Sequence, residues 1–161
     1  KTYGGGSDDS GQSIIKASDG GYIIRYIVES FGARNSSVGI LKISQDGDEI
    51  WSKTIGGSYG IPGNSLQYID NGNYVMICSL FDYGNNSFNS YLLQFNDTGS
   101  ILWDVIWGDK IDDHGLGVLQ TLDGGFIITG STNNYGNGNV FNSDLLLLKT
   151  DANGLMVKFN I

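Results

Sequence analysis

The chain is poor in the residues that most often carry chemistry or covalent cross-links. Its 161 residues include one cysteine, Cys78, and one histidine, His114. A single cysteine excludes an internal disulfide framework, and a single histidine leaves no second imidazole for a zinc site. Lys and Arg number 9 against 17 Asp and Glu, so the formal net charge is −8. Nucleic acids and anionic membrane surfaces require clustered basic residues, so we expect neither as a partner.

Long apolar segments and proline are also scarce. No apolar stretch approaches the roughly 20 residues of a membrane-spanning helix, so we expect no membrane insertion. There is one proline against 25 glycines, and Gly or Asn-Gly pairs recur too often for a 3.6-residue helical period to persist. This composition predicts a β protein with many tight turns.

The chain does contain a threefold internal repeat. Glycines recur at a step of 52 residues, in the sets Gly4, Gly56 and Gly108; Gly11, Gly63 and Gly115; and Gly20, Gly72 and Gly124. A period near 50 with strand-like content is typical of propeller blades or of another β array. We therefore divide one domain, residues 1–161, into repeats at about 1–52, 53–104 and 105–161.

Each repeat is predicted to form a four-stranded antiparallel meander. In the first repeat the strands are expected at Gly11–Ala17, Tyr22–Val28, Val38–Ser44 and Glu49–Ile55. Asp-Gly pairs between apolar runs are strong hairpin signals, and the nearly continuous apolar second strand predicts burial on both faces. The expected fold is all-β, with three four-stranded blades of a propeller-like repeat, completed by another chain or by a larger propeller.

The turn before the fourth strand carries a shared tryptophan. The chain reads Asp46-Gly47-Asp48-Glu49-Ile50-Trp51 in the first repeat and Asp97-Thr98-Gly99-Ser100-Ile101-Leu102-Trp103 in the second. This pattern resembles the tryptophan-docking motif of propellers of the pyrroloquinoline-quinone type, and the repeats look like those of archaeal and bacterial secreted or surface proteins. The resemblance implies that Trp51 and Trp103 are structural docking residues, each packed against the neighbouring blade.

The resemblance does not extend to quinoprotein chemistry. The third repeat has Lys158 where a tryptophan is expected. The quinoprotein pocket, with its metal ligands and ring-stacking tryptophan, has no counterpart in this sequence. We therefore expect no cofactor and no enzymatic activity.

Other catalytic and metal motifs are missing too. The sequence has no nucleophile elbow and no phosphate loop, so we assign no catalytic residue. His114 follows the acidic pair Asp112-Asp113 and is interpreted as part of a solvated turn. The pairs Asp8-Asp9 and Asp112-Asp113 offer oxygen ligands for calcium, but the second repeat has Gly60-Ile61 there, so we expect weak calcium binding or none.

The longer loops gather at one end of the predicted blades. They combine aromatic residues with Asn, Ser and Asp, a composition suited to glycans or to a surface protein. The candidate ligand-binding residues are Phe31, Tyr83, Tyr135, Asp8, Asp9, Asp112 and Asp113. The plainer interpretation, that each aromatic residue only ends its strand, is favoured. Three sequons make Asn35, Asn85 and Asn96 glycosylation candidates.

These features favour a non-enzymatic extracellular or cell-surface repeat module with a structural, adhesive or assembly role. The segment Lys1-Thr2 aligns with Lys53-Thr54, and Ile161 aligns with Thr54, so the third repeat ends where the first begins. Three blades are too few to close a propeller, and open edges invite pairing. We expect head-to-tail self-association into a ring or filament. Two alternatives remain: a carbohydrate-binding propeller using the loop face, and a non-catalytic fragment of a larger secreted enzyme.

Overall fold

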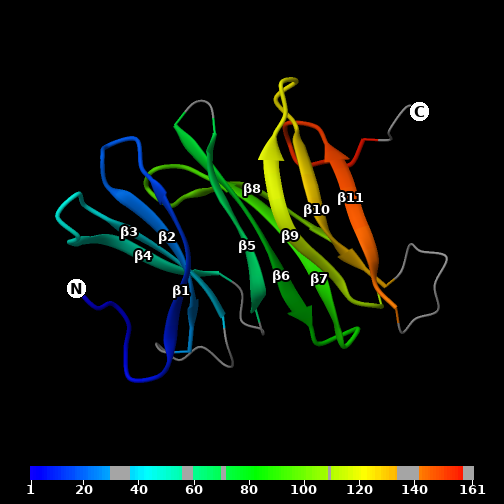
Figure 1. The fold of residues 1–161 in the computed structure, drawn as a ribbon, viewed down its shortest axis with the longest axis horizontal. Coiled ribbons are helices and arrows are strands. Elements are labelled where there is room, and N and C mark those ends of the chain that lie inside the picture. The colour runs from blue at the N-terminus through cyan, green and yellow to red at the C-terminus, as the bar shows by residue number, and fades with distance from the viewer. Residues whose placement is uncertain (30–36, 56–59, 70–71, 109, 134–141, 158–161) are drawn as a thin grey trace.

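In a computed structural model the chain forms three antiparallel β-sheets that stand side by side (Figure 1). The structure describes residues 1–29, 37–55, 60–69, 72–108, 110–133 and 142–157. Sheet 1 contains β1 (Asp9–Lys16), β2 (Tyr22–Val28), β3 (Ser37–Ile43) and β4 (Glu49–Ile55). Sheet 2 contains β5 (Gly60–Ile69), β6 (Asn73–Asp82), β7 (Ser87–Phe95) and β8 (Ile101–Trp107). Sheet 3 contains β9 (Asp113–Gln120), β10 (Phe126–Thr132) and β11 (Asp144–Thr150).

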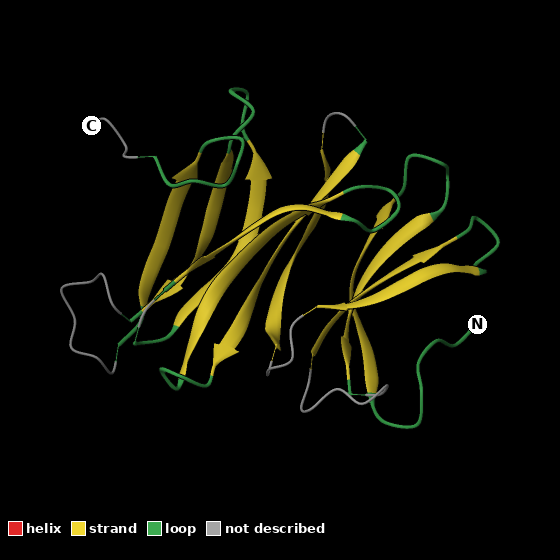
Figure 2. Cartoon of the chain, turned by 180° about the vertical axis from the view of Figure 1, so that it is seen from behind, coloured by secondary structure: helices red, strands yellow, loops and turns green. Residues whose placement is uncertain are grey.

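The prediction of an all-β chain made of antiparallel meanders is confirmed. Within each sheet the strands pair in sequence order, and the described residues include no helix (Figure 2). It follows that the described part of the chain has no helix able to cross a membrane. The three sheets form an open row, with the first strands β1, β5 and β9 in contact along it.

Within the described residues sheet 3 differs from the prediction, because they form three of its strands rather than four. After the turn at 151–154, Thr150 and Met156 form an isolated bridge, and the Val157 amide donates to the Lys149 carbonyl at 2.9 Å. Met156 and Val157 thus begin to pair with β11 as a fourth strand would, but the described residues form no continuous ladder there. Residues 158–161, including Lys158, lie outside the described residues.

The sequence repeat is also a repeat of backbone geometry. The last hairpin of each repeat contains Gly47, Gly99 or Gly154 at a φ of 79°, 73° or 79°. In each, the glycine amide donates to the carbonyl three residues earlier, at 3.0, 2.9 and 3.2 Å. This left-handed conformation is readily adopted by glycine but disfavoured for other residues, which explains why the glycine spacing reveals the fold.

Apolar side chains fill the two spaces between the sheets. Between sheets 1 and 2, Ile23 and Ile40 belong to the same buried cluster as Tyr74, Met76 and Leu93. Between sheets 2 and 3 the buried cluster contains Val75, Ile77, Leu92, Val118, Phe126 and Ile128. The second strand of sheet 2 is therefore buried on both faces, as predicted. The second strands of sheets 1 and 3 are not, because each of these sheets has only one neighbour.

One cross-strand pair in each sheet explains how the repeats tolerate different residues. Tyr26 pairs with Gly39 in sheet 1, Cys78 with Tyr91 in sheet 2, and Gly130 with Leu146 in sheet 3. Each pair combines one large and one small side chain, and a Cβ on Gly39 would overlap the Tyr26 ring. The volume at this position is conserved within the chain although the strand that supplies it changes.

This pairing predicts a compensating effect between Cys78 and Tyr91. Cys78→Tyr puts two rings into one buried pair, and we expect it to lower the free energy of unfolding by about 3 kcal/mol. Adding Tyr91→Gly copies the arrangement of sheet 1, so the double variant should be more stable than Cys78→Tyr alone. Chemical denaturation of both single variants and the double variant measures this coupling, and losses that simply add would contradict it.

Candidate functional site

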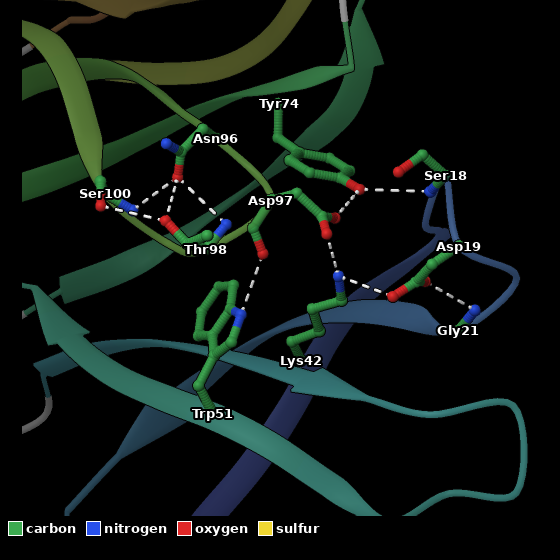
Figure 3. Close-up of polar contacts among 10 residues, drawn as sticks. All are labelled: Ser18, Asp19, Gly21, Lys42, Trp51, Tyr74, Asn96, Asp97, Thr98 and Ser100. Carbon is green, nitrogen blue, oxygen red and sulfur yellow. Dashed lines mark hydrogen bonds and ion pairs between the residues drawn. The ribbon is translucent and has the colours of Figure 1, made fainter.

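The main polar cluster among the described residues lies between sheets 1 and 2 (Figure 3). We call it the junction cluster, and it consists of Ser18, Asp19, Lys42 and Trp51 from sheet 1 with Tyr74 and Asp97 from sheet 2. Three of its members come from tight turns, Ser18 and Asp19 between β1 and β2, and Asp97 between β7 and β8. The turns fixed by glycine thus bring together residues far apart in the sequence.

Lys42 connects the two sheets through a pair of carboxylates. Its side chain is only 3% exposed, and its ammonium group lies 2.8 Å from Asp19 Oδ2 and also forms an ion pair with Asp97 Oδ2. A buried charge is costly unless it is paired, and here both partners are present. Burial lowers the pKa of Lys42, but the hydrogen bonds to Asp19 and Asp97 outweigh it and the pKa is raised. The hydrogen bond from Lys42 is the main cause that lowers the pKa of Asp19.

Asp97 is the residue on which the other contacts converge. Its Oδ1 accepts a hydrogen bond from the Tyr74 hydroxyl at 2.8 Å, and its carbonyl accepts one from the Trp51 indole at 3.0 Å (Figure 3). The Tyr74 hydroxyl in turn accepts from the Ser18 amide at 3.3 Å. Burial is the main cause that raises the pKa of Tyr74. One aspartate therefore receives hydrogen bonds from both sheets.

Both predicted docking tryptophans lie on a glycine of the next sheet. Two ring atoms of Trp51 are 3.0 Å from the position that a Cβ on Gly99 would take. Trp103 lies in the same way over Gly154, where the corresponding distance is 2.6 Å, and its ring also contacts Phe126. Any side chain in place of these glycines would collide with an indole ring. Only glycine therefore fits beneath each tryptophan.

The acidic candidate residues include two carboxylates that accept hydrogen bonds from backbone amides. Asp9 accepts hydrogen bonds from the amides of Gly5 and Glu29, at 2.8 and 3.1 Å. Asp112 accepts one from the Phe88 amide of sheet 2 at 2.9 Å. Asp8 is exposed and Asp113 is buried. No group of three His, Cys, Asp or Glu side chains in the described part of the chain could hold a metal ion.

The other candidate residues are distributed over the loops. Tyr83 is exposed and its ring meets the edge of Phe81, whereas Phe31, Tyr135 and Asn35 lie outside the described residues. The Asn85 amide group donates to Asp82 at 2.8 Å. The side-chain oxygen of Asn96 accepts three hydrogen bonds, two from Thr98 and one from Ser100. Among the described candidates, Tyr83 packs against Phe81, while Asp9 and Asp112 bind backbone amides of other segments.

Cys78 is unsuited to nucleophilic chemistry. Its side chain is fully buried, and desolvation raises the pKa of the thiol to about 12. The thiolate is the reactive form, so the native protein holds this group in its inert state at neutral pH. The presence of cysteine at this position is better explained by its small side chain, which fits beside the Tyr91 ring in the cross-strand pair.

Sequence reasoning missed the junction cluster apart from Trp51. The available signal was a lysine at a core-facing position of the third strand, Lys42, repeated as Lys149 in the third repeat. A lysine at a repeated buried position requires a carboxylate nearby, because unpaired buried charge is strongly unfavourable. That argument calls for a partner but does not identify Asp97, which lies 55 residues away.

The comparisons with known proteins add little to this geometry. The chain matches no protein-family model and no curated protein. One similar solved structure is a protein of unknown function from Bacteroides caccae, with a TM-score of 0.35 and 12% sequence identity. The match covers 95% of this chain and 67% of that chain.

The tryptophan contact leads to a stability prediction. Trp51→Ala should lower the free energy of unfolding by about 3 to 5 kcal/mol, because it removes a ring packed between two sheets. Trp51→Phe keeps an aromatic ring but loses the hydrogen bond to Asp97, so it should cost less, about 1 to 2 kcal/mol. Chemical denaturation measures both values. A loss below about 1 kcal/mol for Trp51→Ala would show that the ring contributes little packing.

The lowered pKa of Asp19 predicts a dependence of stability on pH. A carboxyl group with a lower pKa in the folded state stabilises the fold above its unfolded pKa, near 3.8 for Asp. That contribution is lost as the pH falls below this value and through the folded pKa. Lys42→Met removes the main cause of the shift, so its free energy of unfolding should fall less over this range. Denaturation at neutral and acidic pH tests this, with Lys16→Met as an exposed lysine control; equal falls in both variants would contradict it.

Proposed function

We propose that this chain is a β-propeller-like repeat module with a structural or adhesive role outside the cell or on its surface. Each sheet serves as one blade, and the open row is completed by head-to-tail association with further copies. The assignment to the cell surface rests on the resemblance of the repeats to those of archaeal and bacterial secreted or surface proteins. The assembly rests on one observation, that the free faces of sheets 1 and 3 repeat the residues of the buried junctions.

The outer face of sheet 3 has the same positions that sheet 1 buries against sheet 2. Ile23 pairs with Lys42 in sheet 1 as Ile127 pairs with Lys149 in sheet 3, which fixes the correspondence between the sheets. On this correspondence, Val38 and Ile40, which are 0% and 2% exposed, become Leu145 and Leu147, which are 82% and 52% exposed. Leu119, another exposed leucine, takes the place of Ile15. The outer face of sheet 3 thus carries the apolar residues of a docking face, but no other sheet in the described part of the chain packs against it.

The outer face of sheet 1 is the matching half. Ile14 is 60% exposed, whereas Leu66 at the same position of sheet 2 is covered by sheet 1 and 4% exposed. Tyr22 and Ile24 correspond in the same way to Tyr74 and Met76. The two residues of sheet 1 are only partly buried, whereas the two residues of sheet 2 are fully buried. Contiguous apolar patches of this kind are rarely left open on a soluble monomer and mark interaction surfaces.

The first residues of the chain support this interpretation of sheet 1. The Tyr3 hydroxyl donates to the Gly47 carbonyl, and Lys1 lies beside the same glycine, 3.4 Å from its Cβ position. At the next junction, Lys53 of β4 lies 3.1 Å from the Cβ position of Gly99. The first residues of the chain thus lie against the turn around Gly47 as β4 lies against the equivalent turn of sheet 2, which leaves the exposed apolar residues of β1 and β2 for a second copy.

The two faces differ, so the contact between copies is head to tail. The outer face of sheet 3 of one copy meets the outer face of sheet 1 of the next. Such a contact gives a ring where the rotation closes and a filament where it does not. The proposal assigns no catalytic step, because the hydrogen bonds and ion pairs described above join turns, loops and sheets.

Sedimentation velocity over micromolar concentrations tests the assembly. We expect species larger than the 17.4 kDa chain, increasing with concentration. Leu147→Lys puts a charge on the outer face of sheet 3 and should give a monomer, because a buried unpaired charge opposes docking. Asn85→Lys adds the same charge on an exposed turn and should assemble normally. A stable folded monomer for the unmodified chain at all concentrations would overturn the proposal.

A further inference from the structure

Lys149 of sheet 3 occupies the position that Lys42 occupies in sheet 1. Its ammonium group lies 2.9 Å from Asp123 of its own sheet, as Lys42 pairs with Asp19. Lys42 also bonds to Asp97 of the following sheet, whereas the second acceptor of Lys149 is the Thr150 carbonyl of its own strand, at 2.8 Å. The side chain of Lys149 is 18% exposed, against 3% for Lys42. Sheet 3 thus presents half of the junction cluster on its free face.

The other half has a defined place on sheet 1. The turns at 44–47 and 96–99 are closed by equivalent amide-to-carbonyl bonds, and their glycines have φ angles of 79° and 73°. Asp97 is the second residue of its turn, and Gln45 is the second residue of the other. Gln45 is exposed, and by its equivalence to Asp97 it belongs to the side of sheet 1 that has no neighbouring sheet. A copy docked on sheet 3 as sheet 2 docks on sheet 1 places Gln45 opposite Lys149.

We infer that Lys149 and Asp123 form the receptor for Gln45 of a second copy, and that this contact selects the partner turn. The inference rests on the proposed head-to-tail assembly and names its polar contact. The side-chain oxygen of Gln45 accepts a hydrogen bond from Lys149, where Asp97 offers a carboxylate to Lys42. The neighbouring carboxylate Asp46 adds negative charge to the turn that complements the ammonium group, whereas Asp48 is already paired with Lys1 of its own chain.

The replacement of aspartate by glutamine makes the contact between copies weaker than the internal one. The bond from Lys149 to Gln45 has a charge on the donor only, whereas the bond from Lys42 to Asp97 adds the Coulomb attraction between two opposite charges. The internal junction is therefore the stronger version of the same arrangement. The contact between copies, in contrast, can be strengthened by the single substitution Gln45→Asp.

Gln45→Asp is the decisive experiment, because it restores the residue found in sheet 2. We expect the dissociation constant between copies, measured by sedimentation, to fall by about tenfold, the ratio given by about 1.4 kcal/mol. The gain should be absent in the double variant Gln45→Asp with Lys149→Met. The gain should also shrink at high salt, because it arises from a charge pair near the surface.

Ala152→Asp is the matched control. It adds the same charge at the same position of the equivalent turn in sheet 3, and this residue is also exposed. The turn around Asp97 shows that an aspartate fits this position, so both variants should keep the wild-type circular dichroism and stability. Ala152→Asp should leave the dissociation constant unchanged.

The results separate this inference from the proposal beneath it. If copies associate and Leu147→Lys prevents it, but Gln45→Asp has no effect, the assembly stands and the role of Lys149 is wrong. An equal gain with Lys149→Met or with Ala152→Asp also overturns that role. Monomers in every variant, Gln45→Asp included, overturn both the contact and the assembly.

Discussion

The burial of one sheet face against the next is the interaction on which the rest of this structure depends. Sheet 2 shows the requirement in full, since Tyr74 and Met76 face one neighbour while Val75 and Ile77 face the other. A sheet with apolar residues on both faces cannot shield them alone, and burial of such side chains is the dominant favourable term in folding. Every other feature, from the glycine turns to the tryptophans, either shapes the sheets or fixes how they stack.

The polar contacts set the register of that stacking rather than supply its main driving force. Between sheets 2 and 3, Gln94 stands at the position of Lys42 and Ala152 at that of Asp97, so the ion pairs of the first junction have no counterpart there. Trp103 still packs over Gly154, as Trp51 packs over Gly99. Tryptophan on glycine is thus common to both junctions. The Lys42 contacts distinguish one junction from the other, which is how specificity between similar surfaces arises.

The sequence predicted the parts of the fold that depend on local geometry. Turns that require a positive φ recur as Gly47 and Gly99, and the apolar run of β6 indicated a strand covered on both sides. The contact between Lys42 and Asp97 could not be predicted, because it depends on how two sheets stack across 55 residues of sequence. The repeat also predicted a fourth strand after Thr150, and of this strand the described residues show one bridge, between Thr150 and Met156.

The scarcity of positive charge gives the few lysines a disproportionate influence on how surfaces meet. With 9 basic residues against 17 acidic ones, most random approaches between two copies bring like charges together. Lys42 is one of the few cations, and it is buried between sheets; Lys149 holds the same place on a free face. In the proposed assembly, an approach that sets Lys149 near Asp46, beside Gln45, relieves repulsion that other approaches retain. The apolar faces would then favour the association, and the few positive charges would restrict its orientation.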